Sequence, residues 1–308
     1  MKHIQIIIAL TAITLSMTTH VPVSLGNHCC PHHKSKDTAK KKQLKVCFVA
    51  GKASHGKGKH AHDAGLQYFA DLLNKHMPEI KTAIHKGGWP TDPSFFDGAT
   101  AIVIYTDGGK KHVVMDNLDQ VDALHAKGIG IGCIHYGVEV PKGDPGNRML
   151  NWTGGYFETH WSVNPHWIAE FKSIPEHEVT RGVKPFTMKD EWYFHMRFRD
   201  NMKGVTPVLS AIPPMETIER KDGPHSNNPT VRDEVTKRLP QHLAWVSTTE
   251  NGTRGFGITG GHVHLGWKED NLRKLVLNMI VWLAGGEVPK NGVPSKTPTD
   301  KELDAYLK

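Results

Sequence analysis

The sequence predicts an α/β fold in three layers, with a mostly parallel central sheet between two layers of helices. Two observations indicate this fold. Continuous apolar segments, typical of strands buried on both faces, occur at 44–51, 101–106 and 129–134. Segments with the spacing of amphipathic helices alternate with these strands, and this β-α-β order is typical of parallel sheets, whose neighbouring strands need crossover connections.

The elements of the first half follow one another in a regular order. The strand at 44–51 leads into a loop rich in His, Gly and Lys, and a helix begins at about Asp63, an acidic residue suited to a first helical turn. The strand at 101–106 closes at Asp107, and a helix at 115–127 ends before a glycine. The third strand follows directly, so the three strands and two helices form one β-α-β-α-β unit.

The second half adds a hairpin and a closing helix. Strand-like segments at 243–247 and 255–259 are joined through Asn251-Gly252, a dipeptide typical of tight turns. The apolar residues of the helix that follows share one face: Leu272, Leu275, Val276, Met279, Ile280 and Leu283. The segment 140–242 is rich in Pro, Trp and His, and we interpret it as an insertion on the core and not as a second domain.

The N-terminus has the features of a secretory signal. Lys2 precedes an apolar run at 4–17, and Ser24-Leu25-Gly26 fits a signal-peptidase site. We therefore expect the protein to be exported, to the periplasm or the extracellular space. No later segment is apolar for long enough to cross a bilayer. The expected parts are a signal peptide at 1–26, a basic linker at 27–43, a domain at 44–287 and a C-terminal tail at 288–308.

Neither the charge nor the cysteines point to a special class of protein. Lys2 contributes one unit of the net charge of +7, and segment 34–45, with six lysines and one aspartate, contributes five. The rest of the chain is nearly neutral, so the charge does not indicate nucleic-acid binding. The adjacent Cys29 and Cys30 enclose no loop, and Cys47 and Cys133 lie in apolar strands, where we expect buried thiols rather than disulfides.

Histidines gather where the predicted strands end. The loop after the first strand contains His55, His60 and His62, and the third strand runs into His135. Open α/β sheets bind ligands at the carboxyl ends of their strands, so we expect these side chains to face a common site. The first loop resembles a phosphate-binding P-loop only in part, because Gly58 stands where that motif needs Ser or Thr.

Three further segments supply candidate site residues. His160 and Trp161 end the segment Gly154–Trp161, and Asp190-Glu191-Trp192 follows in the insertion. His262 and His264 come after the last strand, and an extended His-x-His pair presents both rings on one face, as metal ligation requires. Glu139, four residues after His135, is expected to orient the His135 imidazole.

Together these segments resemble the ThuA-like (trehalose-utilisation) family of the class I glutamine-amidotransferase-like superfamily. The resemblance covers about 44–287, and no single motif carries it. The residues that do are 44–62, Gly130–Gly137, Gly154–His160, Val179–Gly182, Asp190–Tyr193 and Gly260–His262. The resemblance implies a flavodoxin-like three-layer sandwich and a role in carbohydrate metabolism, on a disaccharide or keto-sugar.

The same resemblance bears on the chemistry. Amidotransferases of this superfamily carry a cysteine at a sharp turn after a strand, with a His-Glu pair on a later loop. Here His135 stands at that turn, and His264 rather than Glu follows His262, so glutamine hydrolysis by a thiolate is not expected. The family resemblance therefore predicts the fold more closely than the reaction.

We favour an enzyme over two alternatives. In this hypothesis His135, Asp190, Glu191 and His262 are catalytic, because an imidazole titrates near neutrality. In the same hypothesis, a divalent, zinc-like metal ion is bound by His60, His62, His160 and His264. A small carbohydrate is bound by Tyr136, Glu158, Trp161 and Trp192. The first alternative is a non-catalytic sugar-binding protein on the same fold, and the second is a hydrolase with Cys133 as nucleophile. The sequence indicates no nucleic-acid partner and leaves the oligomeric state open.

Overall fold

A computed structural model describes residues 43–307. The predicted signal peptide at 1–26, the linker up to residue 42, and both Cys29 and Cys30 lie outside the described residues. Between residues 43 and 307, no helix has the length and the apolar character needed to cross a membrane.

A seven-stranded sheet forms the centre of the described unit, in the order β2-β1-β3-β4-β11-β10-β9. Six of these strands run in the same direction, and β10 alone is antiparallel to its neighbours. The strands are β1 (Leu44–Ala50), β2 (Ile80–Lys86), β3 (Ala101–Tyr105), β4 (Gly130–Ile134), β9 (Val205–Ala211), β10 (Gln241–Thr248) and β11 (Arg254–Ile258). The mostly parallel sheet and the antiparallel hairpin of β10 and β11 confirm the fold predicted from the sequence.

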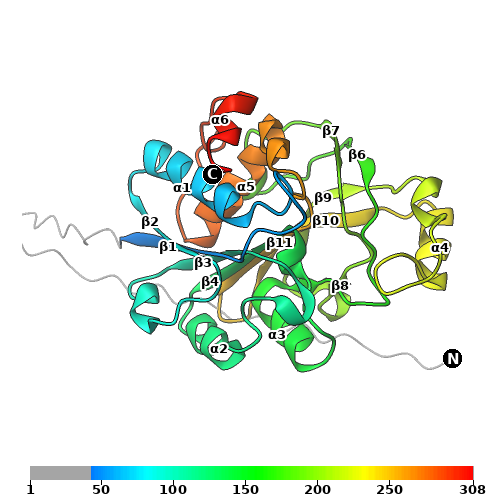
Figure 1. Ribbon diagram of the computed structural model, residues 1–308, viewed down its shortest axis with the longest axis horizontal. Coiled ribbons are helices and arrows are strands. Elements are labelled where there is room, and N and C mark those ends of the chain that lie inside the picture. Colours follow the sequence, from blue (N-terminus) through cyan, green and yellow to red (C-terminus); the bar gives the residue numbers. More distant parts are fainter. Residues whose placement is uncertain (1–42, 308) are drawn as a thin grey trace, which may run out of the picture. The chain divides into compact units, whose positions relative to one another are not determined.

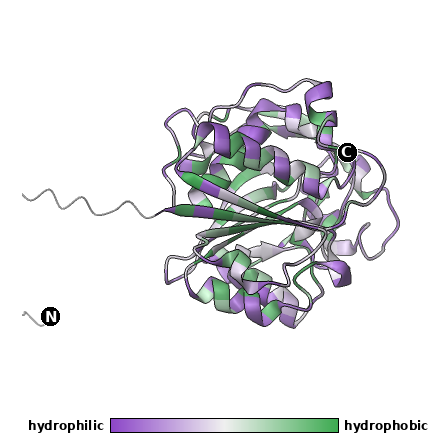
Figure 2. Cartoon of the chain, turned by 60° about the vertical axis from the view of Figure 1, so that its left-hand side comes forward, coloured by the Kyte–Doolittle hydropathy of each residue, from purple (hydrophilic) through white to green (hydrophobic). Residues whose placement is uncertain are grey.

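Helices cover both faces of the sheet (Figures 1 and 2). Helices α1 (His62–His76) and α5 (Asp270–Leu283) pack on one face, and α2 (Leu118–Ala126) and α3 (Asp144–Thr153) pack on the other. Because side chains alternate along a strand, each central strand supplies both cores. In β1, for example, Phe48 packs with the α1–α5 cluster and Val49 with the α2–α3 cluster.

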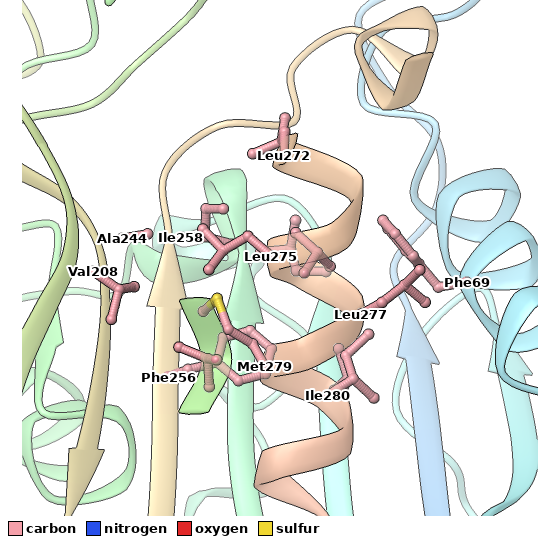
Figure 3. Close-up of a cluster of buried hydrophobic side chains, with 14 of the residues drawn as sticks. Phe69, Val208, Ala244, Phe256, Ile258, Leu272, Leu275, Leu277, Met279 and Ile280 are labelled. Carbon is pink, nitrogen blue, oxygen red and sulfur yellow. The ribbon is translucent and has the colours of Figure 1, made fainter. Parts of the chain in front are cut away.

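Helix α5 is the centre of the larger core. It buries eleven of its residues, and Leu275 and Met279 point toward Ile258 and Phe256 of β11 (Figure 3). Leu277 faces Phe69 of α1 across the same layer (Figure 3). Each such side chain contributes about 1.5–3 kcal/mol when it is fully buried, so this helix is a major source of the stability that holds the strand ends in place.

Two strands of the sheet were not predicted, and both lie at its edges. The sequence pattern predicts no strand at β2, and β9 falls inside the segment 140–242, for which the sequence predicts an insertion. The interpretation of 140–242 is therefore wrong for β9, which pairs with β10 in the main sheet. The predicted helix at 115–127 is shorter than expected and begins at Leu118, because a 3₁₀ turn and bends occupy the residues before it.

The rest of the 140–242 segment builds a cap beside the sheet. Its two small antiparallel pairs are β5 (Gly155–Tyr156) with β8 (Arg197–Phe198) and β6 (Trp167–Phe171) with β7 (Phe186–Asp190). The cap also contains helix α4 (Pro229–Thr236), whereas α3 of the same segment packs on the main sheet. The end of β7 carries Asp190 and Glu191 toward the carboxyl ends of the main strands, as described below.

The C-terminal segment packs against the core. Val288, Val293 and Leu303 are buried, and Leu303 belongs to the short helix α6 (Asp300–Asp304). The fully buried guanidinium of Arg273 in α5 fastens this region, because its Nε donates to Ser295 Oγ at 3.0 Å. The segment after residue 287 is therefore part of the compact unit.

Candidate functional site

Four neighbouring strands carry the site at their carboxyl ends. His60 lies in the loop after β1, Asp107 follows β3, His135 follows β4, and His262 follows β11. The order of the sheet reverses between β1 and β3, since β1 connects outward to β2 and the chain then returns to β3 on the other side. Such a reversal leaves a crevice at the strand ends, where open α/β sheets bind their ligands.

Three imidazoles and one carboxylate converge on a single point. His60 Nε2 lies 3.0 Å from His262 Nδ1 and 3.2 Å from His135 Nε2. Glu191 Oε2 lies 2.9 Å from His262 Nδ1 and 3.5 Å from His135 Nε2. One ligand atom from each of the four residues lies within 4.8 Å of all the others, and we call these residues the His/Glu cluster.

Contacts on the outer side of the cluster determine where the imidazole protons are. His135 Nδ1 donates to the carbonyl oxygen of Thr259 at 2.7 Å, and His60 Nδ1 donates to Asp107 Oδ1 at 3.0 Å. A carbonyl and a carboxylate only accept hydrogen bonds, so these nitrogens carry the protons. When the His60 and His135 rings are neutral, their Nε2 atoms therefore carry no proton, and both atoms face the centre of the cluster.

Burial and the neighbouring polar groups act on the pKa values of His60 and Glu191 in opposite directions. Burial lowers the pKa of His60 to about 4, so its ring is neutral at pH 7 although the Asp107 carboxylate favours the charged form. Burial alone would raise the pKa of Glu191, but its close contacts with the His135 and His262 rings hold it well below its usual range. The cluster therefore presents bare nitrogens beside an ionised carboxylate.

This arrangement fits a bound cation. The two bare Nε2 atoms are 3.2 Å apart and have no proton to share, so their lone pairs repel unless a positive charge lies between them. Donor atoms of a tetrahedral zinc site are about 3.3 Å apart, given zinc–nitrogen distances of about 2.0–2.1 Å. Four of the six spacings between ligand atoms in the cluster, at 2.9–3.5 Å, are close to that value, and all six lie within 4.8 Å. Three imidazoles and a carboxylate could therefore hold a divalent first-row transition metal ion.

Unusual backbone conformations place two of these rings. His60 has φ of 43° and His135 has φ of 53°, values in the left-handed region that non-glycine residues seldom adopt. Each costs roughly 1–2 kcal/mol relative to an ordinary conformation. At His135 the chain turns sharply from β4 into a 3₁₀ turn, His135–Val138, and the turn directs the ring across the sheet edge toward Thr259. Strain of this kind concentrates at functional sites.

Comparison with known proteins agrees with the fold and with the resemblance noted in the sequence. The model of the ThuA family, described as trehalose utilisation, matches residues 45–283. The chain belongs to the ThuA family. No curated protein shows significant sequence similarity to it.

Solved structures related to this ThuA-family chain share its fold at low sequence identity. A ThuA-like protein from Bacteroides uniformis is 15% identical, with a TM-score of 0.55, over 81% of this chain and 94% of that one. A glutamine amidotransferase from Thermotoga maritima is 10% identical, with a TM-score of 0.42, over 79% of this chain and 98% of that one. The predicted three-layer α/β fold with a mostly parallel sheet is confirmed.

The predicted metal ligands of this ThuA-family chain do not converge. Of the four, only His60 belongs to the His/Glu cluster. His62 Nδ1 donates to the Lys52 carbonyl, and its Nε2 lies 3.8 Å from Asp107. His160 is exposed, and His264 Nε2 donates to the carbonyl of Leu303 on the other side of the loop. The other three cluster members are residues for which the sequence suggested catalytic roles.

The His-x-His pair diverges because of the local backbone. Gly261 has φ of 117°, and a 3₁₀ turn, His264–Lys268, begins at the second histidine. The extended backbone is thus limited to Val263, and the two rings contact different groups: His262 contacts His60 and Glu191, and His264 contacts Leu303. The expectation that both rings share one face was wrong for this reason.

The remaining predicted catalytic residue, Asp190, holds two site loops together. It is buried, and its two carboxylate oxygens accept the backbone N–H groups of Glu191 at 2.8 Å and Gly261 at 2.7 Å. Glu191 is itself a member of the His/Glu cluster, and Gly261 directly precedes His262. In the structure Asp190 therefore contacts backbone and not the cluster rings.

The predicted substrate-binding residues lie in different environments. Tyr136 faces the cluster, with its ring centroid 5.6 Å from that of His60. Trp192 is fully buried, so its ring has no face open to a sugar. Trp161 packs against the Arg197 guanidinium, 3.5 Å from the ring centroid, and against the His195 ring at 4.2 Å.

Glu158, the fourth predicted substrate-binding residue, is buried in a polar network. Its carboxylate accepts hydrogen bonds from the Tyr156 hydroxyl at 2.6 Å and from Arg197 at 2.9 Å, and Lys142 lies 3.2 Å away. Hydrogen bonds from these groups outweigh the effect of burial and lower the pKa of Glu158. Of the four predicted residues, Tyr136 is therefore the one positioned beside the His/Glu cluster.

Sequence reasoning missed several residues that border the cluster. The Tyr193 hydroxyl lies 3.1 Å from His135 Nε2, and Ser54 Oγ donates to Asp107 at 2.7 Å. His166 is half-exposed on the solvent side, with its ring centroid 5.0 Å from that of His262. The position of Asp107 directly after a predicted central strand was a signal that could have identified it, as for His135.

The thiols take no part in the site. Cys47 and Cys133 are free and buried, as predicted from their apolar strands. Burial raises the pKa of Cys47 to about 11 and raises that of Cys133 further above its usual value. A buried neutral thiol is a poor nucleophile, so the structure lends no support to a hydrolase based on Cys133.

Glu139 does not orient His135, contrary to expectation. Its carboxylate oxygens lie 3.0 and 3.1 Å from Nε2 of His225, a residue in the loop before α4, and His135 bonds Thr259 instead. The Glu139 hydrogen bond raises the pKa of His225, against the opposing effect of burial. Glu139 thus ties the cap to the turn after β4.

The raised pKa of His225 predicts a pH-dependent contribution to stability. Because the folded chain binds this proton more tightly than the unfolded chain, the contribution is fully present below the unfolded pKa of about 6.5. It is lost as pH rises through the higher folded value. We expect an NMR titration of His225 to give a pKa above 6.5 in the wild type and a lower one in Glu139→Gln. A wild-type value at or below 6.5 would contradict the pairing.

Proposed function

We propose that this ThuA-family protein is an exported, metal-dependent enzyme acting on a carbohydrate, either a disaccharide or a keto-sugar. The family description supports the carbohydrate class, and the apolar N-terminal segment of the sequence supports export. The observation that carries the metal assignment is the close approach of the bare Nε2 atoms of His60 and His135 beside the ionised Glu191.

The His/Glu cluster is the proposed site of a divalent, zinc-like ion. This replaces the earlier expectation, since His135, His262 and Glu191 become ligands beside His60. A bound ion would supply Lewis acidity toward an oxygen of the sugar. Asp107 and the Thr259 carbonyl keep the His60 and His135 rings in the required tautomers, which is the usual outer-shell role in metal sites.

Groups beside the cluster are suited to bind and orient the sugar. The Tyr136 ring and the half-exposed His166 border the cluster on different sides, and both can contact a polyol by hydrogen bonding. The Tyr193 hydroxyl reaches toward both His135 and Glu191, at 3.1 and 3.4 Å, and can donate to an oxygen held there. The reaction classes compatible with such a site are hydrolysis, elimination and isomerisation.

One observation favours a second candidate, a non-catalytic sugar-binding protein. His60, His135 and His262 are each at most 5% exposed, which restricts access to the cluster. In that case the cluster would have a structural role, and sugar would bind outside it. Sugar affinity would then be unchanged in His135→Ala and His262→Ala, and no product would form.

The test begins with elemental analysis of the purified protein, for which we expect about one divalent ion per chain. The protein as purified, after chelation, and after return of the ion is then incubated with disaccharides and oxidised sugars, and products are identified by mass spectrometry. We expect turnover that chelation abolishes and the ion restores. Full turnover without metal would overturn the metal assignment, and binding without any product would favour the sugar-binding alternative.

A further inference from the structure

The two loops that carry His60 and His262 are joined by a short backbone ladder. The N–H of His60 donates to the His262 carbonyl at 3.0 Å, and the N–H of His264 donates to the Gly58 carbonyl at 2.8 Å. Lys59 and Val263 form the antiparallel bridge between these bonds. The relative position of the two cluster histidines therefore depends on this ladder.

The side chain of His264 fastens the ladder to the C-terminal segment. It is buried, with 1% of its surface exposed, and its Nε2 lies 3.2 Å from the carbonyl oxygen of Leu303 in α6. Since a carbonyl only accepts, His264 Nε2 carries the proton and donates it. A side chain that points away from the cluster thus anchors the loop that presents His262 to it.

The C-terminal segment that contains Leu303 is itself packed against the core. Leu303 is fully buried in the larger core, and Tyr306, three residues later, donates from its hydroxyl to Asp71 of α1 at 2.9 Å. Lys268, at the end of the same loop as His264, pairs with Asp300 of α6 at 2.5 Å. The C-terminal segment therefore connects the loop to α1, the helix that follows the His60 loop.

We propose that His264 is a positioning residue for the His/Glu cluster. Through its bond to Leu303 it holds the ladder in register, and the ladder keeps the ring nitrogens of His60 and His262 at the 3.0 Å separation of a ligand pair. The proposal rests on the metal centre described under Proposed function. It gives the second histidine of the His-x-His pair a role other than the ligand role expected from sequence.

The test compares three variants of the full chain. His264→Leu removes the donor at similar size, and His264→Gln retains an N–H that can reach the Leu303 carbonyl. His125→Leu is the matched control, because His125 is also buried and also bonds a backbone carbonyl, that of Ile129 at 3.2 Å. Ile129 lies at the amino end of β4, whereas the cluster lies at the carboxyl ends of the strands.

Two readouts separate positioning from general stability. Titration with Co²⁺, followed by its visible absorption, is expected to give about tenfold weaker binding and an altered spectrum in His264→Leu, as for the loss of outer-shell partners in metal sites. His264→Gln is expected to bind Co²⁺ within twofold of wild type. Hydrogen exchange of the His60 and residue-264 amides is expected to be faster in His264→Leu alone.

The outcomes also distinguish this proposal from the metal centre on which it rests. Equal Co²⁺ binding in His264→Leu and wild type, or an equal loss in His125→Leu, would overturn the positioning role. A wild-type protein that binds no Co²⁺ would overturn the metal centre. Amide exchange would then still decide whether His264 holds the two loops together, because that measurement needs no ion.

Discussion

The substitution His262→Ala is expected to weaken Zn²⁺ binding by at least about 100-fold while the chain remains folded. His262 Nδ1 contacts both His60 and Glu191, at 3.0 and 2.9 Å, so its loss removes a ligand from the middle of the cluster. Loss of an outer-shell partner alone reduces metal affinity about 10- to 100-fold, and loss of a direct ligand should exceed that. The measurement is a competition titration of apo-protein against a chelator of known affinity.

His160→Ala is the matched control for this prediction. His160 also has a left-handed backbone, with φ of 65°, and it was also predicted to be a ligand, but it is exposed and outside the cluster. We expect its Zn²⁺ affinity to equal that of wild type. The metal centre is refuted if His262→Ala retains wild-type affinity, or if His160→Ala loses as much affinity as His262→Ala.

The substitution Arg273→Leu is expected to reduce the free energy of unfolding by about 2–5 kcal/mol, because it removes the donor from two carbonyl acceptors, at about 1–3 kcal/mol each. The Arg273 guanidinium is fully buried, and it donates to the carbonyls of Trp267 and Lys268, to Ser295 and to Asp270. Leucine would leave both carbonyls without partners in the interior. Urea denaturation followed by circular dichroism measures the change.

Arg148→Leu provides the comparison for Arg273→Leu. Arg148 contacts three carboxylates, those of Asp119, Asp122 and Asp144, but it lies at the surface, where ion pairs are weak. We expect a much smaller change in unfolding free energy than for Arg273→Leu. If the two variants were equally destabilised, the number of ionic contacts and not their burial would determine their effect.

The sequence predicted the centre of the sheet because its strands are buried on both faces and must be continuously apolar. The edge strands do not meet that condition. β2 is mostly only partly buried and contains the exposed Lys81 and Lys86. β9 contains Pro207, a residue that usually argues against a strand but is tolerated at a sheet edge. Edge strands were therefore missed for a physical reason.

The site was predictable in its place but not in its internal geometry. Strand ends located His60, His135 and His262, because the ends of neighbouring parallel strands meet at one edge. The direction of each ring depends on a few backbone angles, such as φ of 53° at His135 and 117° at Gly261, which no spacing pattern encodes. The sequence therefore predicted a metal ligand where the structure has a side chain that fixes the backbone. His264, which donates to the Leu303 carbonyl, is the clearest case.

The residues of the His/Glu cluster come from loops that are far apart in the chain, since His60 and His262 are 202 positions apart. An unfolded chain cannot present these groups together, so an ion bound there would associate with the native state alone. By mass action, free ion at 100 times its Kd would then add about 2.7 kcal/mol to the unfolding free energy. The melting temperature would rise with the logarithm of free metal concentration, so the fraction of folded protein would depend on how much metal is available.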